Sequence, residues 1–153
     1  TNPPIDAIRE KVVTSTTVYI GEDGNLLEEK AENCKMLKVH NPILTETDLL
    51  KIKNMKEDGF KVAEIPTIYY KNSSLEKAID YLFIEVDRAI REGANILILS
   101  DRGVDEYHVA MPSLLAVSAI EQYLVRTKKR TAVSIILESA EPRDVHHFAT
   151  LLG

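Results

Sequence analysis

Length and composition place the chain among globular domains of ordinary size. Its 153 residues suffice for one hydrophobic core, and 44% hydrophobic with 28% charged residues is the usual balance of such a domain. A net charge of −5, with no basic run longer than Lys128-Lys129-Arg130, argues against nucleic-acid binding. No apolar run approaches the ~20 residues of a membrane helix, so we expect no membrane partner and no nucleic-acid partner. Because Cys34 is the one cysteine, the chain cannot form an internal disulfide, and we expect a cytoplasmic protein.

Residues 1–35 read as an irregular segment that leads into one α/β domain, residues 36–153. The Pro3-Pro4 pair holds the first residues in extended geometry, and residues 5–13 suit one or two helical turns. A β-branched stretch at 14–20 is followed by the turn residues 21–25. Since the chain starts without methionine and stops directly after an apolar helical pattern, we expect it to be excised from something longer.

From residue 36 onward the pattern becomes regular. Residues 39–44 suit a short extended piece. The Thr-x-x-Asp pattern of Thr45 and Asp48 then marks a helix start, and a stripe of apolar residues predicts that this helix continues until Gly59.

The next two elements are a strand and the clearest helix of the chain. Residues 62–70 are rich in β-branched and aromatic side chains, and Pro66 predicts a break or bulge within the strand. Ser73 and Glu76 have the spacing of a capping box, and Gly93 is the expected residue after the helix end. The apolar face of this helix consists of Leu75, Ile79, Leu82, Phe83, Val86 and Ile90.

Two largely apolar runs, residues 95–99 and 133–137, in which Asn95 and Ser134 are the polar members, are typical of strands buried on both faces of a parallel sheet. A helix opened by Pro112 lies between them, and Pro142 at a first-turn position predicts a last helix. This alternation predicts an α/β fold whose parallel sheet of β-α units resembles part of a β/α (TIM-like) barrel. A flavodoxin-like three-layer sandwich is the alternative.

Polar residues follow the first buried run, where parallel sheets carry their functional groups. Ser100, Asp101, Arg102 and Asp105 bring a hydroxyl, two carboxylates and a guanidinium to one loop. They suit phosphate binding or acid–base work, but equally an ion pair that braces the loop. With no nucleotide or hydrolase motif in the sequence, the bracing interpretation is the stronger one.

The histidines and the cysteine do not form a recognisable catalytic or metal-binding set. His146 and His147 are adjacent, so their side chains point about 100° apart on a helix and cannot share one metal ion. Cys34 lies in a polar stretch with no neighbouring base. We therefore predict no catalytic, cofactor-binding or metal-binding residue in the chain.

Three stretches carry a family resemblance. The segment from Thr1 to Glu10 resembles the TNPPID-x-IRE motif of glutamate synthase large (alpha) subunits, and residues 95–104 resemble one of their strands with its following loop. Residues 112–117, 138–139 and 145–149 resemble the stretch before their flavin-binding domain. The resemblance runs the length of the chain and is to the carboxy-terminal part of the central domain.

The resemblance implies a parent enzyme that makes two glutamates from glutamine, 2-oxoglutarate and a reductant. In that family a glutaminase domain releases ammonia, an internal channel carries it, and a domain with FMN and an iron–sulfur cluster performs the reduction. The central domain lies between them and holds no cofactor. The chain would thus be a non-catalytic connector whose partners are those two domains. An FMN- or phosphate-binding half-barrel and a small stand-alone hydrolase are the alternatives.

The resemblance also names candidate channel residues. The TNPPI segment lies near the glutaminase end of the ammonia channel in the family, which points to Thr1, Asn2 and Ile5. A part-barrel cut from its neighbours exposes apolar surface, so self-association of the excised domain is expected. Whether the parent uses NADPH, NADH or ferredoxin is decided outside these residues.

Overall fold

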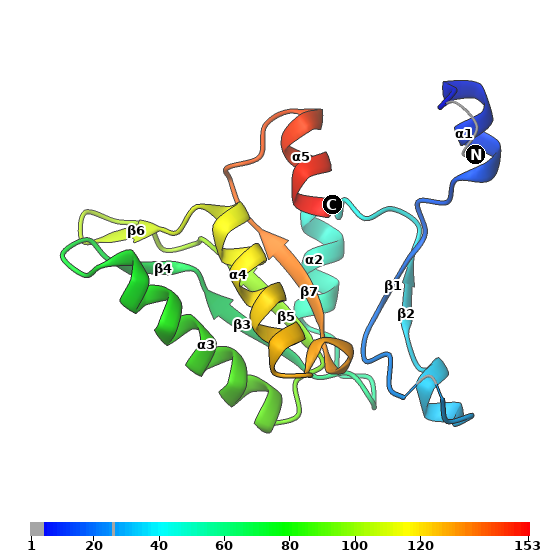
Figure 1. The fold of residues 1–153 in the computed structure, drawn as a ribbon, viewed down its shortest axis with the longest axis horizontal. Coiled ribbons are helices and arrows are strands. Elements are labelled where there is room, and N and C mark those ends of the chain that lie inside the picture. Colours follow the sequence, from blue (N-terminus) through cyan, green and yellow to red (C-terminus); the bar gives the residue numbers. More distant parts are fainter. Residues whose placement is uncertain (1–4, 26) are drawn as a thin grey trace.

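Three parallel strands form the centre of the molecule in a computed structural model that describes residues 5–25 and 27–153 (Figure 1). These strands are β3 (Val62–Pro66), β5 (Ile96–Ser100) and β7 (Ser134–Glu138), in the spatial order β3-β5-β7. Their register places the carboxyl-terminal residues Pro66, Ser100 and Glu138 side by side at one edge. Parallel strands in chain order confirm the predicted α/β fold, a partial β/α arrangement.

The described residues form five α-helices: α1 (Ala7–Val13), α2 (Glu46–Lys53), α3 (Leu75–Arg91), α4 (Ser113–Arg126) and α5 (Val145–Leu152). Short 3-10 turns lie at η1 (Ala31–Cys34) and η2 (Arg130–Ala132). The crossover helices α3 and α4 lie side by side on one face of the sheet, and α2 lies on the other (Figure 1). No helix among the described residues is long and apolar enough to cross a membrane.

The central strand β5 supplies the core of both faces. Because side chains alternate along a strand, Leu97 and Leu99 pack against α3 and α4, whereas Ile96 and Ile98 pack against α2 and its neighbours. All four are fully buried. The prediction of a strand covered on both faces is confirmed, and this burial explains why the four residues Ile96–Leu99 are all aliphatic.

Helix α3 has the predicted apolar face, with one boundary changed. Its N-cap is Ser74, whose side chain accepts a hydrogen bond from the backbone of Lys77, so the predicted cap at Ser73 is wrong by one residue. At the other end, Gly93 N donates to the Ile90 carbonyl and Ala94 N to the Ala89 carbonyl. This pair of bonds is the Schellman motif, which needs a residue with positive φ at Gly93.

Two short antiparallel ribbons complete the fold. β1 (Val18–Ile20) pairs with β2 (Leu37–Val39), and β4 (Ile68–Tyr70) pairs with β6 (His108–Ala110). The predicted strand at 62–70 is therefore two strands in two sheets, broken after Pro66. The break is held by buried Thr67, whose N–H donates to Ser100 and whose carbonyl accepts from Met111.

Other predicted boundaries differ by a few residues. The capping box of Thr45 and Asp48 is present, but α2 ends at Lys53, six residues before Gly59. Helix α5 begins after its N-cap Asp144, so Pro142 stands in the preceding loop and not in the first turn. The extended piece lies at Leu37–Val39 and precedes most of the predicted range 39–44. Gly59 and Pro142 therefore do not mark the boundaries of α2 and α5.

The first described residues lie to one side of the sheet (Figure 1). Helix α1 is capped by Asp6 and buries none of its residues. The strand β1 that follows ends in Ile20, which packs under the sheet, and Gly21 exchanges hydrogen bonds with the Ser134 side chain. The division of the chain at residue 36 stays a prediction, and the β1–β2 ribbon connects its two sides.

We expect Gly93→Ala to lower the free energy of unfolding by about 1 kcal/mol, because an L side chain is disfavoured at the positive φ of this position. No atom would clash with the added Cβ, so the loss reports backbone conformation alone. Urea denaturation of the 153-residue chain measures it. Gly93→Asn should lose less, since asparagine tolerates this region, and equal losses for both variants would contradict the explanation.

Candidate functional site

The strongest cluster of charged groups lies at the carboxyl edge of the sheet. Ser100 ends β5 and is 2% exposed, and Glu138 stands beside it at the end of β7. The Ser100 hydroxyl donates to Glu138 Oε2 over 2.7 Å, and Arg102 Nε donates to Oε1 over 2.6 Å. One carboxylate therefore holds the loop after β5 through both of its oxygens.

Helix α2 adds a second cation from the opposite face of the sheet. Lys53 Nζ lies 2.8 Å from Glu138 Oε2 and 3.0 Å from Glu64 Oε2 on β3. At the start of the same helix, Glu46 lies 3.6 Å from the Arg102 guanidinium. The two ends of α2 thus contact the sheet edge through ion pairs, which hold α2 over the face of the sheet opposite α3 and α4.

The protonation states in this cluster are set by pairing. Burial by itself raises the pKa of Glu138, but hydrogen bonds from Lys53, Arg102 and Ser100 outweigh it and lower that pKa to about 2. Lys53 and Arg102 each donate a hydrogen bond to Glu138, and this bond raises the pKa of each cation. At neutral pH all three groups are charged, and Glu138 cannot act as a base without first losing its partners.

Asp101, in the loop after β5, contacts the loop after β7. Its Oδ2 accepts the Ser139 hydroxyl over 2.6 Å and the Ala140 N–H over 3.1 Å. In the same loop after β7, Glu141 Oε2 accepts a hydrogen bond from the Ser113 N–H at the start of α4, a helix whose N-cap is a proline. The loops after β5 and β7 are therefore joined to each other and to α4 by carboxylates that accept backbone hydrogen bonds.

Asp105 stands apart from this cluster. In the loop before β6, its Oδ1 accepts the backbone N–H groups of Tyr107 and His108 and lies 2.9 Å from His108 Nδ1. The backbone hydrogen bonds lower the pKa of Asp105. Of the four loop residues predicted as candidates, the structure brings Ser100, Asp101 and Arg102 to one edge and leaves Asp105 on the β4–β6 ribbon.

The sequence-based prediction missed the contribution of α2 to the cluster. Lys53 and Glu64 lie 85 and 74 residues before Glu138, and nothing in their local pattern marks them. The register of the parallel strands would have paired Ser100 with Glu138, since both end their strands. Of the predicted channel residues, Thr1 and Asn2 lie outside the described residues, and Ile5 is 91% exposed ahead of α1.

The two adjacent histidines lie on α5, where both are exposed. His147 Nε2 is 3.7 Å from Asp144 Oδ2, a contact within one helical turn. Within residues 5–25 and 27–153, no three His, Cys, Asp or Glu side chains gather in a way that could hold a metal ion. Cys34 is a free, exposed thiol.

The comparison with known families decides the affiliation of the chain. The family model of the glutamate synthase central domain matches residues 1–153. The chain belongs to this family. The predicted resemblance is confirmed, including its extent over the whole length.

Curated relatives of the central domain agree. The chain is 42% identical to the glutamate synthase [NADPH] large chain of Bacillus subtilis over 153 residues, which is 100% of the chain and 10% of that protein. It is 40% identical to glutamate synthase [NADH] of Schizosaccharomyces pombe, over all of the chain and 8% of that protein. For ferredoxin-dependent glutamate synthase 2 of Synechocystis the identity is 39%, over all of the chain and 10% of that protein. The chain spans about a tenth of the length of these relatives.

We expect the Glu138 cluster to make stability fall with acid. The folded-state pKa of about 2 lies below the ordinary 4.5, so the stabilisation is present above pH 4.5 and is lost as the pH falls toward 2. The loss is at most about 3 kcal/mol, since solvent screens the exposed Arg102. Denaturation at pH 7 and at acid pH measures it.

A matched pair of variants assigns this pH dependence. Glu138→Gln should remove most of the acid-dependent part between pH 4.5 and 2. Glu64→Gln removes a carboxylate that also contacts Lys53 but is about half exposed, so it should leave the profile nearly unchanged. An unchanged profile in Glu138→Gln would show that other carboxylates carry the acid sensitivity.

Proposed function

We propose that the chain is a non-catalytic connector of a glutamate synthase polypeptide, lying between its glutaminase and FMN-binding domains and contributing to the ammonia channel. The whole-length match to the central domain family carries this proposal. The geometry supports the non-catalytic part of it, because Glu138 and Asp101 are both engaged by internal donors. An acid or base held in this way serves the architecture of the loops.

The contacts at the sheet edge weigh against the anion-binding alternative. A phosphate or flavin phosphate would need the Arg102 guanidinium and the Ser100 hydroxyl, and both donate to Glu138. Any anion would also meet the charge of Glu138 itself, which remains ionised at neutral pH. The reductive chemistry of the parent, with its FMN and iron–sulfur cluster, is accordingly assigned to other parts of the polypeptide.

The exposure of α1 supports a channel or interface role for the start of the chain. Ile5, Ile8 and Val12 recur at helical spacing, and all three are largely exposed. A helix of seven residues is marginal in water without tertiary packing, so a contact with another part of the polypeptide would stabilise it. Self-association of the separated domain is proposed on the same ground.

We expect Asn2→Trp in the full-length enzyme to uncouple its two reactions, because a bulky side chain would narrow a channel lined by the TNPPI segment. The measurement is the ratio of glutamine hydrolysed to glutamate formed from 2-oxoglutarate, which should rise several-fold. Leu27→Trp, at a position 94% exposed, is the control and should keep the ratio of the parent. Unchanged coupling in Asn2→Trp would count against the channel role.

Flavin titration separates the connector from the half-barrel alternative. We expect no quenching of FMN fluorescence when the 153-residue chain is added, because its anion-binding donors are paired with Glu138. Glu138→Gln removes the carboxylate that pairs with Arg102, so this control shows whether an unpaired Arg102 is enough to bind FMN. A yellow complex formed by the unaltered chain would overturn the cofactor-free interpretation.

A further inference from the structure

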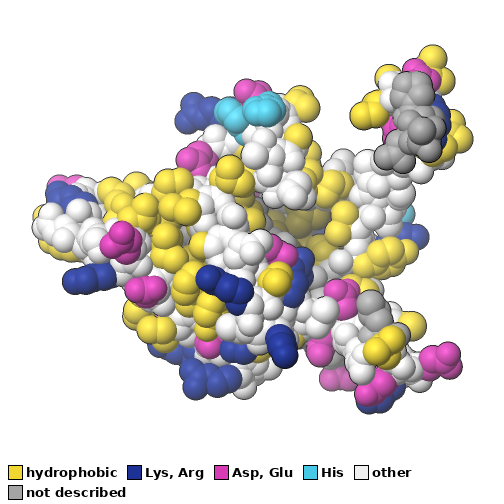
Figure 2. Space-filling model, in the orientation of Figure 1, with side chains coloured by type: hydrophobic (Ala, Val, Ile, Leu, Met, Phe, Trp, Pro, Cys, Tyr) yellow, Lys and Arg dark blue, Asp and Glu magenta, His cyan; other side chains and the backbone are white. Residues whose placement is uncertain are grey.

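The amino-terminal segment, residues 5–23, is attached to the rest of the molecule through few buried groups. Helix α1 has no buried residue, and of the three residues of β1 only Ile20 is buried. Figure 2 shows α1 standing apart from the main body of the molecule. The β1–β2 ribbon has three residue pairs, and a two-stranded ribbon of this kind is marginally stable by itself. Segments with few buried contacts open locally at a lower free energy than the whole domain.

One side chain fastens this segment directly after β1. Gly21 is buried, and its N–H donates to Ser134 Oγ over 2.9 Å. The same hydroxyl donates to the Gly21 carbonyl, also over 2.9 Å. A single hydroxyl thus serves both backbone groups of a buried residue that lies 113 positions earlier in the chain. Because buried backbone groups without partners are costly, loss of this hydroxyl would destabilise the attached arrangement through two groups at once.

The sheet places Ser134 for this contact. Ser134 begins β7, which pairs in parallel register with the buried strand β5. Side chains alternate along a strand, so Ser134, Ile136 and Glu138 belong to one face of β7. On that face Ile136 packs in the same cluster as Ile20, and Glu138 contacts helix α2. Strand β7 therefore holds the amino-terminal segment at its first residue and α2 at its last.

Other polar contacts of the segment lie at the surface. The Asp23 N–H donates to the Thr131 carbonyl over 2.9 Å. The Thr16 hydroxyl donates to the His40 carbonyl over 2.9 Å. All four residues are exposed, so water replaces either bond at small cost. The two bonds of buried Gly21 are the ones that water cannot replace while the segment stays in place.

We propose that residues 5–23 form a strap that opens as a unit, and that the Ser134 hydroxyl is the latch that holds the strap on β7. Opening breaks the two Gly21 bonds and separates Ile20 from Ile136, while the parallel sheet stays intact. Apolar contact at Ile20 is non-directional, so the hydroxyl fixes the position of the strap along β7. A contact that binds α1 in one of the two arrangements would shift the equilibrium between them.

Hydrogen–deuterium exchange in the full-length enzyme measures this opening. Ser134→Thr and Ser134→Val form a matched pair, because their side chains have the same shape and differ in the hydroxyl that bonds Gly21. We expect the peptide over residues 17–23 to exchange about tenfold faster in Ser134→Val than in the unaltered enzyme. Ser134→Thr should keep the slow exchange. Equal exchange in the two variants would overturn the proposal.

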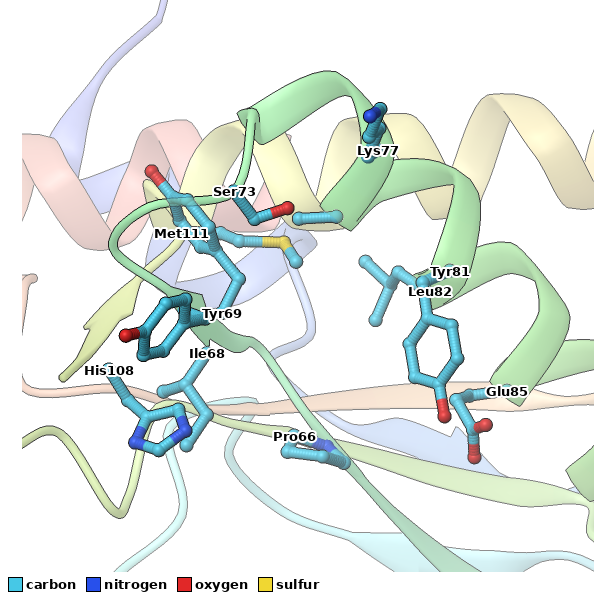
Figure 3. Close-up of a pocket in the computed structure, with 12 residues that line it drawn as sticks. Pro66, Ile68, Tyr69, Ser73, Lys77, Tyr81, Leu82, Glu85, His108 and Met111 are labelled. Carbon is cyan, nitrogen blue, oxygen red and sulfur yellow. The ribbon is translucent and has the colours of Figure 1, made fainter.

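Two references show whether the change is confined to the strap. Ser139→Ala removes another hydroxyl, one that donates to Asp101 in the loop after β5, and should leave exchange at residues 17–23 unchanged. Residues 77–85 of α3 line a pocket next to the β4–β6 ribbon, on the opposite face of the sheet from Ile20 (Figure 3). They should keep their protection in every variant. Faster exchange there as well would mean global destabilisation and would contradict a strap that opens by itself.

Ser134→Ala covers the case in which the additional methyl group of threonine and valine is not tolerated. It adds no atom, and exchange at residues 17–23 should match that of Ser134→Val. Slow exchange in Ser134→Ala would overturn the latch. The exchange readout does not depend on enzyme activity or on the coupling of the two reactions, so the strap and the proposed connector function can fail separately.

Discussion

Burial of β5 is the constraint on which the rest of the structure depends. Each face of this strand meets a different layer, with α3 and α4 on one side and α2 with the β1–β2 ribbon on the other. The four aliphatic side chains Ile96–Leu99 are fully buried, and burial of each contributes roughly 1.5–3 kcal/mol. This burial stabilises the packing of the surrounding elements against β5. The neighbouring strands, the crossovers and the two helical layers follow from covering this one strand.

Burial of this strand also requires hydrogen-bond partners for the polar residue at its carboxyl end. Ser100 must end the strand inside the protein, and the loop after it carries charged residues. Glu138 meets this need by accepting from Ser100, Arg102 and Lys53 at once, which ties β5, β7 and α2 together. A carboxylate engaged in this way is a poor catalyst, since proton transfer would disrupt three stabilising contacts. The residue types that suggest acid–base chemistry in the loop therefore serve its architecture.

The proposed connecting role agrees with the size of the relatives and with surface features of the domain. The relatives are many times longer, and among the described residues β3 has one strand neighbour and helix α1 has no buried residue. Matching relatives are named for NADPH, NADH and ferredoxin, so a common central domain accompanies different electron donors. This is consistent with a connecting role, in which contacts to adjacent domains matter more than chemistry within the chain.

Local pattern by itself determined much of this protein. The two apolar runs predicted the strands β5 and β7, although only β5 is buried throughout and β7 is buried at Ile136 alone. The periodic stripe predicted α3, and Thr45 and Gly93 marked two helix ends, because these signals act over a few residues of backbone. Pro66 predicted the break within 62–70, but the tertiary structure alone decided that the two halves join different sheets, that β4 pairs with β6, and that Lys53 converges on Glu138. Those features join residues dozens of positions apart, and their geometry exists only once strand register and helix packing bring distant side chains to the same edge of the sheet.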